Sequence, residues 1–195
     1  PLASPRKTRR YRRTQKFLGE KLLWVTIIEM EKFQELRELS KKKVAIADHI
    51  LTQTYPLIKD AKLLLAVIEN IFLALSYSMS SLLHHERYIK RIPVFSDNFT
   101  SKFNLFITKC VPMYNFKKDY ILLIQNIKEI LVAHKKSPVE FLRKDRFVIC
   151  GDNYNLTTIS YEQTKNYLSL TKLFVNQIDN IISRESNLQP KNASL

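Results

Sequence analysis

The strongest constraint on the fold comes from residues 55–93, which hold the longest apolar run of the chain between prolines at positions 56 and 93. A proline is tolerated in the first turn of a helix and ends a helix that reaches it from the other side. The last turn before Pro93 contains Arg87, Lys90 and Arg91, which suit the negative end of a helix dipole. We therefore predict one long helix over these residues.

This helix has the length of a membrane span, since about 20 apolar residues suffice to cross a bilayer. It also contains Glu69, Asn70 and several serines, and an ionised group near a membrane centre costs about 2.5 kcal/mol or more. A helix that is apolar nearly all round is typical of the centre of a bundle. The sequence thus predicts a central bundle helix without a membrane partner, with Glu69 as a buried or half-buried, paired acid.

Composition points to a mostly helical fold in a reducing environment. The 195 residues include only two glycines, which is too little turn chemistry for a fold of many strands. Cys110 and Cys150 are the only cysteines, far too few for a secreted disulfide scaffold, so a cytoplasmic location is expected. The net charge of +14 and the pI near 9.8 favour a polyanionic partner.

Residues 1–29 differ from the rest of the chain. They hold eight Lys or Arg against two Glu, which is +6 of the total charge and leaves +8 for the other 166 residues. One interpretation is a disordered basic arm that contacts nucleic-acid phosphates. The other is a stretch upstream of a true start at Met30, where a clean amphipathic pattern begins.

Further elements follow from local patterns. A first bundle helix starts at Met30, a third is capped by Ser96 or Asp97 and closed by Pro112, and a fourth spans residues 117–134. Ser137 and Glu140 form a capping box that predicts a short helix, and Ser160 with Gln163 predicts the cap of the last helix, which ends near residue 183. Between these boxes, residues 147–150 and 154–159 flank turn formers and predict one hairpin.

The fold prediction is a mostly all-α bundle of five to six helices around a long central helix, with one small β-hairpin before the last helix. Residues 30–184 form this domain, residues 1–29 are the basic extension, and residues 185–195 are a polar, disordered tail.

Most catalytic and cofactor chemistries have no signature here. Two isolated glycines exclude a phosphate-binding loop and a dinucleotide fingerprint, and no Gly-x-Ser-x-Gly elbow occurs. The two histidines at positions 84 and 85 and the two cysteines have no Cys-x-x-Cys or His-x3-His pair that would anchor zinc. We predict no catalytic residues, no metal site and no cofactor.

Nucleic acid remains as the favoured partner. Basic side chains cluster at predicted helix ends, where several could converge on one face and contact phosphates. The alternative is that these side chains are ordinary solubilising charges. The candidate nucleic-acid-binding residues are Arg87, Lys90, Arg91, Lys135, Lys136, Arg143, Lys144 and Arg146.

The chain resembles a group of uncharacterised small archaeal proteins over roughly residues 30–182. Three stretches carry this resemblance: LLHHERYIKRIP, FTSKFNLF and HKKSPVEFLRKDRFVICGDNY. More loosely, a bundle of this size is similar to the HEPN superfamily, many of whose members are ribonucleases or partners of nucleotidyltransferases. The catalytic element of that superfamily is an Arg followed by His after four to six residues. No histidine of this chain has an Arg at that spacing, so the resemblance implies an RNA-facing or partner-binding role without catalysis.

The functional prediction is a non-enzymatic nucleic-acid or ribonucleoprotein module, with RNA favoured over DNA. Two alternatives stay open. One is a bundle for protein interaction or homodimer formation, and the other is a divergent HEPN-like nuclease with a different acid–base pair.

Overall fold

The computed structural model describes residues 5–144, 146–151 and 155–188, with side chains described between residues 27 and 185 of these ranges. The chain enters through a long helix, α1 (Pro5–His49), and returns through α3 (Lys62–Tyr88). The other elements are η1 (Ile50–Thr54), α2 (Tyr55–Ile58), α4 (Phe99–Leu105), η2 (Phe106–Cys110), α5 (Val111–Tyr114), α6 (Lys118–Lys136), β1 (Val139–Arg143), β2 (Arg146–Cys150), β3 (Leu156–Ser160) and α7 (Tyr161–Leu188).

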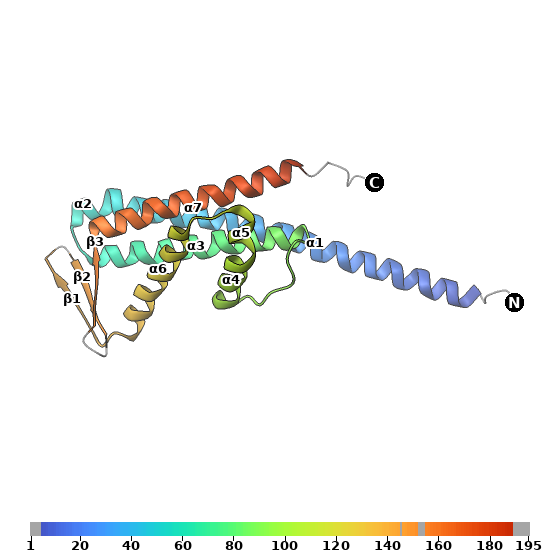
Figure 1. Cartoon of the computed structure of the whole chain (residues 1–195), viewed down its shortest axis with the longest axis horizontal. Coiled ribbons are helices and arrows are strands. Elements are labelled where there is room, and N and C mark those ends of the chain that lie inside the picture. Colours follow the sequence, from blue (N-terminus) through green and yellow to red (C-terminus); the bar gives the residue numbers. More distant parts are fainter. Residues whose placement is uncertain (1–4, 145, 152–154, 189–195) are drawn as a thin grey trace.

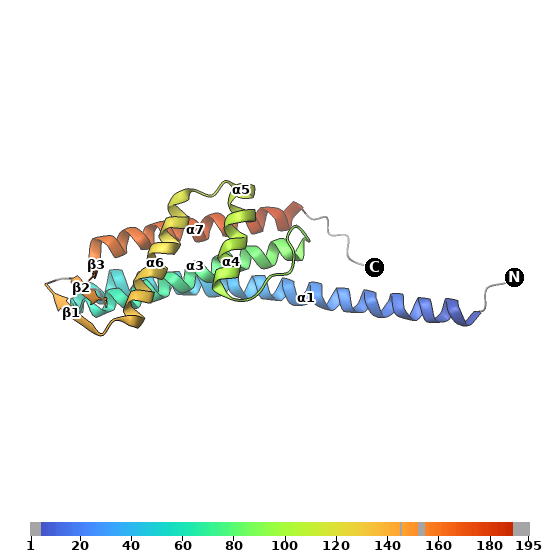
Figure 2. The ribbon, with the colours of Figure 1, turned by 60° about the horizontal axis from the view of Figure 1, so that its bottom comes forward.

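The helices form one bundle with a small sheet at its end. α1, α3 and α7 run side by side along the long axis, whereas α4 and α6 cross them, and the first part of α1 extends beyond the bundle (Figures 1 and 2). Among the described residues, η1 and α2 continue α1, and η2 and α5 continue α4. The described part of the chain therefore forms five continuous helices, which we call rods. The predicted fold class, a mostly helical bundle around a long central helix, is confirmed.

α3 lies at the centre because small side chains let its neighbours approach closely. Ser81 Oγ donates to the Phe33 carbonyl of α1 at 2.9 Å, and Ser40 Oγ donates to the Ala74 carbonyl of α3 at 2.9 Å. By length and composition alone, α3 is also the one helix in the described part of the chain that could cross a membrane, and 50% of its most apolar window is buried in the bundle. The absence of a membrane partner stays a prediction.

The predicted single helix over residues 55–93 is wrong at both ends, since α3 stops at Tyr88 and Lys90 has a left-handed φ of 62°. The first rod runs through Pro56 and ends at Lys59, whose φ of 55° is left-handed, and α3 begins only at Lys62. A proline inside a helix lacks an N–H and clashes with the carbonyl four residues earlier. The wide turn η1 relieves this clash, since the Tyr55 N–H donates to the Ile50 carbonyl five residues back. Sequence reasoning placed the break at the proline itself.

Pro112 is accommodated in the same way and does not close its helix. The Val111 N–H donates to the Phe106 carbonyl across the wide turn η2, and the rod ends at Asn115 with φ of 50°. Such turns are rare and relieve strain in the helical hydrogen-bond ladder. The same wide turn at both positions shows that neither proline alone sets the end of its helix.

The short helix predicted after Ser137 is also wrong, because residues 139–143 form strand β1. Ser137 Oγ donates to the carbonyls of Val139 and Cys150 instead of capping a helix. The predicted hairpin is therefore a three-stranded antiparallel sheet in the order β1-β2-β3. The turn of the predicted hairpin is residues 151–153, of which 152 and 153 lie outside the described residues, as does residue 154 at the start of its predicted second strand.

Three further predictions concern helix ends and Glu69. Ser160 Oγ accepts from the Gln163 N–H at 3.3 Å, which confirms the cap of α7. The cap of α4 is Asn98, whose side chain accepts from the Ser101 N–H at 2.8 Å, rather than Ser96 or Asp97. Glu69 is exposed, not buried or half-buried.

The chain ends differ from their prediction in secondary structure. Helix α1 begins at Pro5, where irregular chain through residue 29 was expected, and α7 continues to Leu188, beyond the expected end near residue 183. Residues 1–4 and 189–195 lie outside the described residues. The division into extension, domain and tail stays a prediction.

Candidate nucleic-acid interface

The sheet turns one face to the helices and one face outward. Phe147, Ile149 and Ile159 join the hydrophobic core, so the alternate residues of each strand belong to the outer face. The strand register aligns these residues in three rows. The basic row is Arg143, Arg146 and Ser160, the middle row is Phe141, Val148 and Thr158, and the apolar row is Val139, Cys150 and Leu156.

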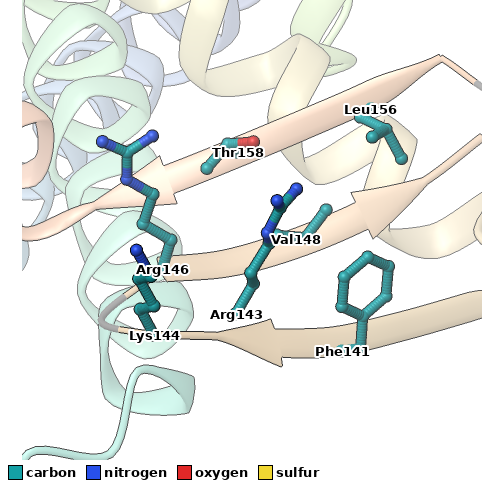
Figure 3. Close-up of a pocket in the computed structure, with 7 residues that line it drawn as sticks. All are labelled: Phe141, Arg143, Lys144, Arg146, Val148, Leu156 and Thr158. Carbon is teal, nitrogen blue, oxygen red and sulfur yellow. The ribbon is translucent and has the colours of Figure 1, made fainter.

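The outer face gathers positive charge at the turn between β1 and β2. Arg143 and Arg146 are direct partners across the strands, and Lys144 occupies the turn with a left-handed φ of 54°. Figure 3 shows these three side chains rising from the same face as Phe141. Together with Val148, Leu156 and Thr158 they border a shallow concavity of about 490 Å³. We call Arg143, Lys144 and Arg146 the hairpin cluster.

The hairpin cluster has no carboxylate partner among the side chains that the structure describes. Residues 143–146 comprise three basic residues and Asp145, which lies outside the described residues, so their formal charge is +2. Like charges directly opposite each other in a sheet are destabilising. The Arg143–Arg146 pair thus presents positive charge that an external anion could neutralise.

Apolar side chains lie directly beside this charge. Phe141 is 40% exposed and Leu156 is 58% exposed, whereas Val148 between their strands is only 4% exposed. The outer face therefore has a packed floor with an exposed aromatic ring on the edge strand β1. This face combines an exposed aromatic residue with arginines that have no carboxylate partner among the described side chains, and nucleic-acid binding uses both base stacking and phosphate contacts.

Arg87, at the opposite end of the bundle, is neutralised internally. Its Nη1 lies 3.0 Å from Glu29 Oε1, and its guanidinium lies 5.9 Å from the centre of the Phe95 ring. The other Glu29 oxygen lies 2.6 Å from His84 Nδ1. Glu29 and His84 are both buried, so Arg87 closes a polar contact between α1 and α3. We call Arg87, Lys90 and Arg91 the α3-end cluster.

Arg91 of the α3-end cluster is paired as well. It donates to Glu185 at 2.8 Å and to the Tyr114 hydroxyl at 3.2 Å. The hydrogen bond to Glu185 raises the pKa of Arg91 above its ordinary value. Lys90 is exposed with φ of 62°, and no ion pair of it occurs among the described residues.

Behind Arg91 lies a fully buried acid. Glu86 is 0% exposed and accepts from the Tyr114 hydroxyl at 2.6 Å. The pKa of Tyr114 is raised well above its usual range, mainly by burial and secondly by the hydrogen bond to Glu86. This arrangement ties α3 to α5 and α7, which makes the end of α3 a structural junction.

Lys135 and Lys136 lie at the end of α6. His134 Nδ1 is 2.5 Å from Glu140 Oε1 of β1, which attaches the helix to the sheet. Both lysines are exposed, and Lys135 borders an apolar cavity of about 420 Å³ together with Phe72 and Phe99. Neither lysine forms an ion pair with a described residue.

The α3-end cluster lies far from the hairpin cluster, so these two clusters do not converge as the sequence suggested. The hairpin lies near the start of α3, because Lys62 borders the same cavity as Phe141 and Leu142. The α3-end cluster follows 27 helical residues later, a length of about 40 Å at 1.5 Å per residue. Lys135 and Lys136 are separated from the hairpin cluster by β1, about 13 Å along the strand.

Catalytic and metal chemistry have little support in the described residues. No group of three or more potential metal ligands occurs there. Burial raises the pKa of Cys110 to about 12, so its thiol stays protonated and a poor nucleophile at neutral pH. The absence of catalytic residues, metals and cofactors remains a prediction.

Phe141 is the residue of this interface that sequence reasoning missed. It was assigned to a short helix, where its side chain had no defined neighbours. The signal lay in two apolar segments separated by Lys144-Asp145, since a two-residue link between such segments is typical of a hairpin. The competing capping-box pattern at Ser137 obscured it.

Comparison of the chain with protein-family models, with curated proteins and with solved structures found no match. The resemblance to small archaeal proteins and to the HEPN superfamily therefore stays a prediction, and the geometry of the outer face is the remaining guide to function.

Proposed function

We propose that the protein is a non-enzymatic nucleic-acid-binding module, acting without a cofactor and with RNA favoured over DNA, that contacts phosphates through the hairpin cluster. The observation that supports this proposal is the contrast in charge pairing. Arg143, Lys144 and Arg146 are exposed and unpaired among the described residues, whereas Arg87 and Arg91 are held by buried or half-buried carboxylates.

Phosphate contacts suit this cluster for two reasons. Guanidinium groups form paired, charge-assisted hydrogen bonds to phosphate oxygens, and Arg143 and Arg146 are direct neighbours across the hairpin. The chain as a whole has a net charge of +14, which attracts polyanions over a distance that salt shortens. Such contacts give affinity without sequence choice.

The test compares two double variants that lower the net charge equally. Arg143→Glu with Arg146→Glu reverses the hairpin cluster, whereas Lys42→Glu with Lys118→Glu reverses two exposed lysines that form no ion pair with a described residue. Both are made in the full chain with the six Lys and Arg of residues 6–13 changed to Gln, so that the basic extension does not mask the result.

The hairpin variant is expected to bind a fluorescent single-stranded RNA at least about 100-fold more weakly, since each charge-assisted hydrogen bond contributes about 1.5 kcal/mol or more. The lysine variant is expected to lose far less. Equal losses in the two variants would mean that only net charge matters, and the assignment of the hairpin cluster would be wrong.

The edge strand β1 supports a second candidate function, which is association with a protein or with a second copy of this chain. β1 is one of the two outer strands of the sheet, and Val139 and Leu142 on it are 55% and 48% exposed. An exposed edge strand is a template for pairing with another strand. Light scattering coupled to size-exclusion chromatography tests this candidate, with a dimer that persists at high salt and is lost in Leu142→Lys as the supporting result.

A further inference from the structure

We propose that the outer face of the sheet binds single-stranded nucleic acid, with phosphates on the basic row and an unpaired base stacked on Phe141. This inference rests on the proposed nucleic-acid function and specifies its ligand. It uses two features of the same face that act on different parts of a nucleotide, namely the charge of the hairpin cluster and the exposed ring beside it.

The strand register fixes how these two features are placed. Phe141 and Arg143 are two residues apart on β1, so both side chains point to the outer face about 6.6 Å apart along the strand. The same spacing on β2 separates Arg146 from Val148. The basic row thus runs parallel to the middle row that contains Phe141, as the backbone and the bases of one extended strand require.

The surroundings of Phe141 suit stacking. Its direct partner across the strands is Val148, which is 4% exposed and forms the floor beside the ring. Phe141 is 40% exposed and belongs to an edge strand, so part of its side chain is accessible to a ligand. Figure 3 shows the ring beside the Arg143 side chain on the same face.

A duplex could use only half of this surface. Its phosphates lie outside and could contact the hairpin cluster, but its bases are stacked on each other and do not reach an aromatic side chain. Stacking on Phe141 therefore requires a single strand, in which bases can be splayed out. The structure thus favours a ligand with accessible bases over a ligand with phosphates alone.

The experiment measures binding of the full chain with residues 6–13 neutralised to four probes. These are a 12-nucleotide uridine RNA, the corresponding thymidine DNA, a 12-base-pair RNA duplex and linear polyphosphate. We expect the single strands to bind more tightly than the duplex and the polyphosphate. Comparable affinity for all four probes would overturn the inference. Of the two single strands, tighter binding of the RNA supports RNA as the ligand, and tighter binding of the DNA identifies single-stranded DNA.

A pair of substitutions on β1 separates stacking from general damage. Phe141→Ala removes the ring from the outer face, and Leu142→Ala removes an exposed apolar side chain from the opposite face of the same strand. Phe141→Ala is expected to weaken binding of the single strands about 5- to 150-fold, the value of one base–aromatic stack, and to leave duplex and polyphosphate binding unchanged. Leu142→Ala is expected to leave binding of the single strands, the duplex and the polyphosphate unchanged.

The outcomes distinguish this inference from the proposed function. If Arg143→Glu with Arg146→Glu abolishes binding while Phe141→Ala has no effect, the phosphate contacts stand and the stacking is wrong. The proposed function and the stacking inference are both wrong if the charge-reversal variant binds like its lysine control. They are also both wrong if none of the four probes binds. Phe141→Trp checks for misfolding, because it keeps an aromatic face and should restore binding.

Discussion

The α3-end cluster and the hairpin cluster each contain two arginines and one lysine, but their environments are opposite. Arg87 and Arg91 contact Glu29, Glu86 and Glu185, so their charge is used inside the bundle. Arg143 and Arg146 face each other across a turn with no described carboxylate beside them. A run of basic residues therefore says little about function until its acidic partners are located.

The difference has a physical cause. Arg87 and Arg91 lie where the end of α3 meets α1 and α7, and these two helices supply Glu29 and Glu185 as partners. Among the described side chains, no helix places a carboxylate beside Arg143 and Arg146 on the outer face of the sheet. This sheet lies at the end of the bundle in Figure 1.

The largest expected effect on stability is that of Arg87→Ala. It leaves the buried Glu29 carboxylate without its cation, and loss of one partner of a buried ion pair costs about 3 kcal/mol. Urea denaturation should show this loss, while RNA binding should remain within about twofold. Strong loss of RNA binding by a folded Arg87→Ala protein would instead assign the α3-end cluster to the interface.

The second largest effect on stability is expected for Tyr114→Phe. It removes the hydroxyl that donates to the fully buried Glu86, and an unsatisfied buried acceptor costs about 1–3 kcal/mol. Thermal unfolding followed by circular dichroism measures this cost. A melting temperature equal to that of the unsubstituted protein would mean that Glu86 is not held by Tyr114.

Acid should weaken the contact between α1 and α7 by about 1 kcal/mol, typical of a partly exposed ion pair. The hydrogen bond from Arg37 holds the pKa of Asp179 below its usual 3.8, with a second hydrogen bond from Lys41. A lowered pKa in the folded state gives stability that is present above pH 3.8 and lost as the pH falls toward the folded-state pKa.

Denaturation of the protein and of Asp179→Asn between pH 6 and pH 3 checks this prediction. The variant should be less stable near pH 6, and the difference should shrink as the pH approaches 3. A difference that does not change with pH would exclude an ionised Asp179 as its cause.

The smallest expected effect on stability is that of Arg143→Ala. The side chain is exposed and faces another arginine, so its removal should change the unfolding free energy by less than about 0.5 kcal/mol and relieve repulsion. Urea denaturation in parallel with Arg87→Ala makes the comparison direct. A loss as large as that of Arg87→Ala would show that the hairpin cluster is structural.

Much of the fold follows from local patterns in the sequence. The apolar run of α3 and the Ser160–Gln163 cap of α7 were predicted from residue spacing, and the structure confirms both. These features depend on interactions within one helix or on burial of one helix. They need no knowledge of distant residues.

The strand β1 and the outer face of the sheet were missed because they depend on distant residues. Ser137 has the pattern of a helix cap, but Cys150, thirteen residues away, offers its carbonyl and pairs residue 139 into a sheet. The candidate site was missed for the same reason, because Phe141 and Arg146 share a face only once the strand register is known. The basic residues could be identified from the sequence alone. Which of them form ion pairs with carboxylates became clear only from the fold.

The most direct test of the account is the salt dependence of RNA binding by the full chain with residues 6–13 neutralised. Three phosphate contacts from the hairpin cluster predict a slope of about −2 in log affinity against log salt for a single strand. Arg143→Gln with Arg146→Gln should reduce the slope to about −0.7, while Lys42→Gln with Lys118→Gln leaves it near −2. A slope that is unchanged in the hairpin variant would contradict the claim that this cluster contacts phosphates.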